Sequence, residues 1–168
     1  MIPRTCVVVA DGGRARLFTI ESEVGPDLAD YPHLIEREGM VNAAVGVSAM
    51  NHSDDHGTGR RTMFRAGPTH GYEDRWDREE IRLKRKFARD VAEEALRFAT
   101  EAGVFQVLLV AEPRMLGLLR KHHGMFEKAH IRCAEHAGDV TKLNAAAVHQ
   151  WMAAAGLVAA PATLAAVA

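Results

Sequence analysis

Basic side chains are concentrated in the middle of the sequence, in a pattern that could bind the phosphate groups of a nucleic acid. Residues 60–89 contain ten basic and five acidic side chains. Some of the basic residues recur at spacings of three and four, which places them on one side of a helix. Arginine suits phosphate because its guanidinium group can donate two parallel hydrogen bonds. The candidate nucleic-acid contacts are Arg60, Arg61, Arg65, Arg82, Arg85, Lys86 and Arg89.

The same stripe also has a purely structural interpretation. Acidic residues stand three or four positions from several of the cations, as Glu79 does from Arg82 and Asp90 from Lys86. Pairs at this spacing meet on the surface of a helix and stabilise it slightly. A solvated helix face and a nucleic-acid contact both remain open on the sequence alone.

Histidines form a second group with possible chemistry. Asp54 and Asp55 lie between His52 and His56. Imidazole and carboxylate groups are good ligands for zinc or nickel. Gly57 and Gly59 indicate a loop, however, and a solvated segment is the simpler interpretation. The weak candidate metal ligands are His52, His56 and His70.

Composition and motifs restrict the class of protein. The chain has 168 residues, 48% of them hydrophobic, and a formal net charge of −1. This composition is typical of one globular domain with a large core. Cys6 and Cys133 lie far apart in apolar stretches, and we interpret both as buried reduced thiols. No Walker loop, GxSxG, HExxH or CxxC motif occurs, and we expect no cofactor. Without a signal peptide or an apolar run of about 20 residues, we expect no membrane span and a cytoplasmic location.

The order of elements predicts a mixed α/β fold. The pattern indicates a sheet of about five strands, in the order β-β-β-α-β-α-β-α, with helices on its faces. Asp11-Gly12-Gly13 is typical of a hairpin turn, because glycine tolerates positive φ. We expect one domain over residues 1–155, with a long mobile loop at 42–76 and an Ala-rich tail at 156–168. The expected strands are 5–10, 15–20, 34–41, 105–111 and 129–135, and the expected helices are 77–102, 113–123 and 143–155.

Several residues mark the faces and ends of the expected helices. Gly103 would stop the long helix, and Thr141 or Asn144 would cap the last one. His122 and His123 close the middle helix, where positive side chains suit the macrodipole, and an RNA contact is the alternative. We interpret Gly117 as allowing that helix to pack closely on the sheet. The apolar face of the long helix comprises Ile81, Ala88, Val91, Ala95, Phe98 and Ala102.

Four segments taken together resemble the bacterial host attachment protein family. They are, in chain order, residues 7–18 (VVVADGGRARLF), 87–92 (FARDVA), 107–120 (VLLVAEPRMLGLLR) and 139–143 (DVTKL). The resemblance extends over nearly the whole chain apart from the 42–76 loop and the tail. That family in turn is similar to the middle domain of archaeo-eukaryotic peptide-chain release factors, which implies a ribonuclease H-like sheet.

The resemblance implies different functions. The family name implies a factor for bacterial attachment to host cells that acts at the surface. The release-factor likeness implies the ribosome, tRNA or other RNA as partner, and we expect a non-enzymatic binding module. Residues 56–61 (HGTGRR) take the place of the Gly-Gly-Gln tip of the release factors, but glutamine is absent. We therefore expect phosphate contact by Arg60 and Arg61 in place of peptidyl-tRNA hydrolysis.

A nuclease is the third possibility that the resemblance implies. Ribonuclease H-like nucleases hold two divalent ions with carboxylates at the ends of neighbouring strands. Asp11 and Glu112 follow the first and fourth expected strands, and Glu93 or Glu94 would come from the long helix. The Asp-Gly-Gly turn accounts for Asp11 without any chemistry. The alternative therefore depends on how Asp11 is used in the folded chain.

Overall fold

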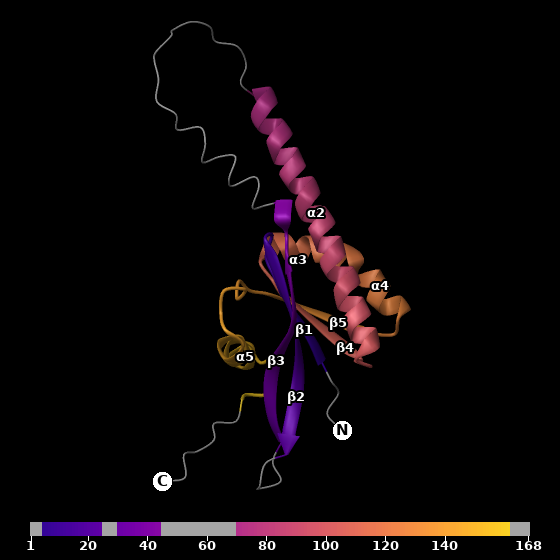
Figure 1. Cartoon of the computed structure of the whole chain (residues 1–168), viewed down its shortest axis with the longest axis vertical. Coiled ribbons are helices and arrows are strands. Elements are labelled where there is room, and N and C mark those ends of the chain that lie inside the picture. The colour runs from indigo at the N-terminus through magenta and orange to yellow at the C-terminus, as the bar shows by residue number, and fades with distance from the viewer. Residues whose placement is uncertain (1–4, 25–29, 45–69, 162–168) are drawn as a thin grey trace, which may run out of the picture.

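A single five-stranded sheet with helices on both faces forms the body of the protein (Figure 1). The computed structural model describes residues 5–24, 30–44 and 70–161, with side chains described for 5–22, 32–44 and 78–161. None of the helices in these ranges combines the length and apolar composition needed to cross a bilayer. The strands are β1 (Thr5–Ala10), β2 (Arg14–Val24), β3 (Asp30–Val41), β4 (Gln106–Ala111) and β5 (Arg132–Ala137). The helices are α2 (His70–Glu101), α3 (Pro113–Leu119), the 3-10 turn η1 (Arg120–His122), α4 (His123–Lys128) and α5 (Ala145–Ala154).

The sheet is mixed, as the sequence predicts. Its strand order is β3-β2-β1-β4-β5. β1 and β3 each pair with β2 in the antiparallel sense, whereas β4 is parallel to both β1 and β5. The carboxyl ends of β1, β4 and β5 therefore lie at the same end of the sheet. This arrangement brings Asp11 and Glu112, which follow β1 and β4, to neighbouring positions.

The turn between β1 and β2 is the expected hairpin, but its glycines are required for another reason. The backbone N–H of Asp11 donates to the carbonyl of Arg14 at 2.9 Å. Neither Gly12 nor Gly13 has a positive φ, contrary to the prediction. A Cβ at Gly12 would instead lie 3.1 Å from Cε of Lys84. Glycine at position 12 therefore makes room for a lysine of α2 that crosses the turn.

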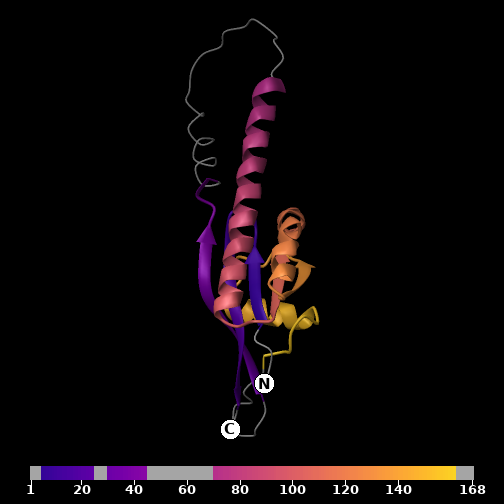
Figure 2. The same cartoon turned by 90° about the vertical axis from the view of Figure 1, so that its right-hand side faces the viewer.

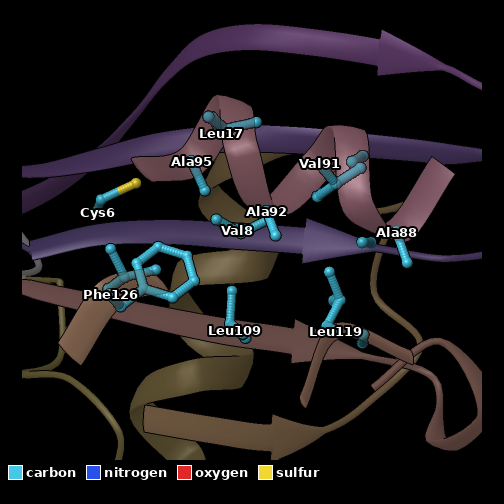
Figure 3. Packing of buried hydrophobic residues seen from close by; sticks show 14 of the residues in the cluster. Cys6, Val8, Leu17, Ala88, Val91, Ala92, Ala95, Leu109, Leu119 and Phe126 are labelled. Carbon is cyan, nitrogen blue, oxygen red and sulfur yellow. The ribbon is translucent and has the colours of Figure 1, made fainter. Parts of the chain in front are cut away.

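Two apolar clusters cover the two faces of the sheet. On one face, small residues of α2 let the helix lie close to the strands, where Ala92 and Ala95 meet Val8 and Leu17 (Figure 3). On the other face, Val148 and Met152 of α5 cover Val7, Val9, Phe18, Leu108 and Val110. Leu157 and Val158 also pack against this second cluster, beyond the end of α5.

The long helix starts earlier than the sequence indicates. α2 begins at His70, seven residues before the expected start at Asp77, so the loop predicted for 42–76 is wrong over its last residues. Figures 1 and 2 show the amino-terminal part of α2 extending beyond the edge of the sheet. Ile81, expected on the buried face, is 47% exposed, and the first buried side chain among residues 78–101 is Phe87. A helix that projects beyond its sheet has nothing to bury, and its apolar periodicity is lost.

The connection between β4 and β5 also differs from the prediction. One helix over 113–123 was expected, but α3, η1 and α4 follow one another as far as Lys128. The N–H of Ile131 donates to the carbonyl of Phe126 at 2.9 Å, and His130 adopts a left-handed φ of +58°. This turn uses residues 129–131, and β5 therefore starts at Arg132 instead of Ala129. Ala129 and Ile131 are apolar residues on either side of His130, and this alternation is typical of the start of a strand.

The start of the last helix follows one of the two proposed caps. The side-chain oxygen of Asn144 accepts a hydrogen bond from the N–H of Ala147 at 2.8 Å. Asn144 is therefore the cap of α5. Thr141 instead donates its hydroxyl proton to Asp11.

Candidate nucleic-acid interface

Basic side chains from two separate elements line an open groove of about 520 Å³ beside α2. One wall is made of the four α2 cations that the sequence singles out. The other wall comes from the end of α3 and from η1, where Leu118 supplies an apolar side chain. The lining residues are Arg82, Arg85, Lys86, Arg89, Leu118, Lys121 and His122. We call this feature the basic groove.

The packing of α2 on the sheet determines where its cations point. Successive residues turn by about 100° around a helix, and Ala88 and Ala92 are buried against the sheet. Arg85 and Arg89 then project about 60° and 100° away from Ala88, toward the side on which α3 lies. The stripe predicted from spacing is therefore one wall of a groove.

The second wall was not recognised as a wall from the sequence. Lys121 and His122 stand in η1, and the sequence interprets this basic run as the end of a helix. His122 lines the basic groove, whereas Nε2 of His123 lies 3.7 Å from a carboxylate oxygen of Glu135. Only the packing of α3 against α2 on one face of the sheet brings the two walls together.

Three of the four α2 cations have carboxylate partners on the same helix. The nitrogen–oxygen distances are 2.5 Å for Arg82–Glu79, 3.2 Å for Lys86–Asp90 and 2.7 Å for Arg89–Glu93. The hydrogen bond from Arg82 lowers the pKa of Glu79. The structural interpretation of the stripe predicts the pairs Glu79–Arg82 and Asp90–Lys86, and both pairs are confirmed. Because the groups are exposed, water and salt screen the pairs, and a phosphate can compete for the cations.

Arg85 and Lys121 differ from the other cations of the basic groove. Within the described ranges, neither makes an ion pair with a carboxylate. They stand on opposite walls. Five lining residues carry a full positive charge, and three of them are paired with carboxylates, so the groove and its partners have a net charge of +2.

The carboxylate proposed for nuclease chemistry is used in the β1–β2 turn. One oxygen of Asp11 accepts from the backbone N–H groups of Gly13 and Arg14, at 2.7 and 2.8 Å. The other accepts from the hydroxyl of Thr141 at 2.5 Å. Burial raises the pKa of Asp11, but these three hydrogen bonds and the charge of Arg14 outweigh it, and the pKa lies below its ordinary value.

The geometry at this end of the sheet does not assemble a metal site. Glu112 lies close to the turn, since one of its oxygens is 3.7 Å from the position of a Cβ on Gly12. Among the described residues, however, no three His, Cys, Asp or Glu side chains are placed to hold one metal ion. Asp11 therefore organises the turn between β1 and β2.

Several sequence-based candidates cannot be placed in the site. Arg60, Arg61 and Arg65 lie outside the described residues, as do His52 and His56. His70 is the first residue of α2, and its side chain is outside the described set. The basic groove is therefore built here from residues 82–122 alone.

Sequence comparison now places the chain in a family. Residues 6–152 match the family described as "Protein required for attachment to host cells". The chain belongs to this family. No curated protein shows a significant match. Among solved structures, the chain is similar to a Ppx/GppA phosphatase of Aquifex aeolicus, with 12% identity and a TM-score of 0.37. The match covers 81% of this chain and 36% of the phosphatase chain.

Proposed function

We propose that this member of the host attachment family is a non-enzymatic module that binds the phosphate backbone of RNA, in association with the ribosome, through the basic groove. The observation that carries the proposal is the convergence of cations from two elements on one groove. A helix stabilised only by its own ion pairs needs no cations on the facing element. Lys121 and Arg85 have no structural partner among the described residues, and a ligand gives both of them a role.

The charge of the basic groove limits how many phosphates it can bind. Two of its cations make no ion pair with a carboxylate of the described residues, and three more become available if the ligand displaces their partners. For a single strand, the logarithm of the binding constant falls with the logarithm of salt concentration by about 0.7 per phosphate neutralised. The expected slope therefore lies between about −1.4 and −3.5. A slope in this range indicates a short contact.

The architecture is compatible with the release-factor likeness. A mixed sheet with order β3-β2-β1-β4-β5, whose first strand is central, supports the ribonuclease H-like relation that the resemblance implies. The use of Asp11 in the turn supports binding over phosphodiester cleavage. Fold alone does not establish function, so the proposal depends on the groove.

Co-sedimentation with ribosomes and with isolated RNA at several salt concentrations tests the proposal. The first variant replaces Arg82, Arg85 and Arg89 with alanine. The matched control replaces Lys128, Arg132 and Lys142, three exposed cations outside the groove, and changes the net charge equally. We expect the first variant to lose binding and the control to retain it. Equal loss in both would show that only overall charge matters, and absence of binding by the wild type would refute the proposal.

The family description favours a second candidate, a factor that acts at the cell surface in attachment to host cells. A membrane-impermeant label applied to intact cells separates the two. Labelling of the protein together with loss of adhesion in a deletion strain, without ribosome co-sedimentation, would favour the surface role. Protection from the label together with co-sedimentation would favour the RNA role.

A further inference from the structure

We infer that the basic groove takes a single RNA strand lengthwise between α2 and η1, with one phosphate held from both sides by Arg85 and Lys121. This inference rests on the proposed function and adds the form of its ligand. It excludes duplex RNA as the preferred ligand of this site.

The shape of the groove is the first argument. α2 and α3 pack against each other, and the axes of packed helices lie about 8–10 Å apart. The basic groove is the open furrow beside these two helices, and its volume of about 520 Å³ lies within the range of small-molecule sites. An extended strand can enter such a furrow. A duplex carries its phosphates on a wide convex surface and would contact only the rims.

The distribution of charge is the second argument. Arg85 and Lys121, which pair with no carboxylate in the part of the chain that the structure describes, are on opposite walls, so a ligand that contacts both must lie between them. The paired carboxylates belong to residues further around α2. Glu79, Asp90 and Glu93 project about 180°, 200° and 140° from the sheet-facing Ala88. Each carboxylate therefore lies about 40–60° further around the helix than the cation it pairs with. The interior of the furrow is therefore its most positive part, and its outer α2 rim is less positive.

The apolar and aromatic lining is the third argument. Leu118 supplies an apolar side chain, and His122 supplies a flat ring on the same wall. A base or sugar that is exposed in a single strand can pack on these groups, because stacking on a ring does not depend on base identity. In a duplex the bases are stacked inside and are not available for this contact. We therefore expect weak sequence preference.

Fluorescence anisotropy with two labelled probes tests the inference. One probe is a short unstructured oligoribonucleotide, and the other is a fully paired RNA hairpin containing the same sequence. We expect the single strand to bind at least about tenfold more tightly than the hairpin. Arg85→Ala and Lys121→Ala should each weaken binding of the single strand by about three- to tenfold, since each removes one hydrogen bond to phosphate at an exposed site, where water screens the charge.

Lys128→Ala is the matched control. Lys128 is exposed on α4, outside the groove, and makes no ion pair with any described residue. The Lys128→Ala variant should bind RNA as the wild type does. All three substitutions replace surface side chains, and a thermal melt of each variant checks that it is folded.

The outcomes separate this inference from the proposed function. If the hairpin binds as tightly as the single strand, the single-strand inference is wrong, but RNA binding stands. If Lys121→Ala has no effect while Arg85→Ala does, the two-sided contact is wrong. If inorganic polyphosphate competes as well as RNA at equal phosphate concentration, the role of Leu118 and His122 is wrong. If neither probe binds, both proposals fail.

Discussion

Gly138 provides a sharp test of how the second cluster is packed. It follows β5, and its backbone N–H donates to the carbonyl of Ala111 at 2.9 Å. A Cβ at this position would lie 2.4 Å from Cη2 and 2.6 Å from Cζ2 of Trp151. These distances are far shorter than a carbon–carbon contact, so Gly138→Ala forces the indole or the backbone to move.

The surroundings of Trp151 decide what that movement costs. The indole meets the ring of His136 edge-on, with centroids 5.5 Å apart, and packs against the second cluster. The backbone at Gly138 is held by its hydrogen bond to β4. Since neither partner can move freely, the cost is that of overpacking a core, about 1–3 kcal/mol of unfolding free energy.

Urea unfolding of Gly138→Ala and Gly117→Ala measures the effect and supplies its control. Gly117 lies inside α3, but a Cβ there would meet no atom within 4 Å outside its own helix backbone and chain neighbours. The expectation that Gly117 allows close packing on the sheet is therefore wrong. Gly117→Ala should stabilise the protein by up to about 1 kcal/mol, because alanine is the better helix former. The two glycine substitutions should thus have opposite signs.

A double variant isolates the contact with Trp151. Trp151→Leu removes the ring that the new methyl group would strike, so adding Gly138→Ala to this background should cost little. The two changes should then sum to more than the cost of the double variant. A cost below about 0.5 kcal/mol for Gly138→Ala alone, or strict additivity with Trp151→Leu, would refute the packing argument.

Three further predictions concern buried and capping groups. Burial raises the pKa of Cys6 to about 12 and that of Cys133 to about 11. Cys6 should therefore resist a thiol reagent until the protein unfolds, and the half-buried Cys133 should react slowly. The absorbance change of a chromogenic thiol reagent measures both rates. The lowered pKa of Asp11 means that its contribution to stability is present above about pH 4 and is lost as pH falls through the folded pKa. Asp11→Asn should flatten that acid dependence in urea titrations, and an unchanged pH profile would contradict the role in the turn. Asn144→Ala should cost about 1 kcal/mol in the same assay, because it removes the cap of α5.

The basic groove shows how far the sequence could go toward a site. Spacing along one helix is a local property, and the wall formed by Arg82, Arg85 and Arg89 follows from it. The facing wall belongs to a segment about 30 residues away, and no periodicity links Lys121 to Arg85. Such contacts across the fold depend on how helices pack, and this could not be predicted from either segment.

Element boundaries failed where burial does not mark them. α2 was expected at Asp77 because apolar spacing begins there, but its projecting part has no sheet to cover. β5 was misplaced by three residues because Ala129, His130 and Ile131 alternate as strand residues do, although they form a turn with a left-handed φ at His130. Hydrophobic periodicity reports only the parts of an element that face a core.

The sequence by itself determined the layered α/β architecture of this protein, its hairpin and the cationic stripe of α2, and it narrowed the cap of the last helix to Thr141 or Asn144. Each of these depends on residues close together in the chain, whose backbone preferences and spacing carry the information. The tertiary structure alone decided that Asp11 is held by Thr141, that Gly138 makes room for Trp151, and that Lys121 faces the stripe. These contacts join segments far apart in sequence, and only the packing of helices on the sheet brings them within reach.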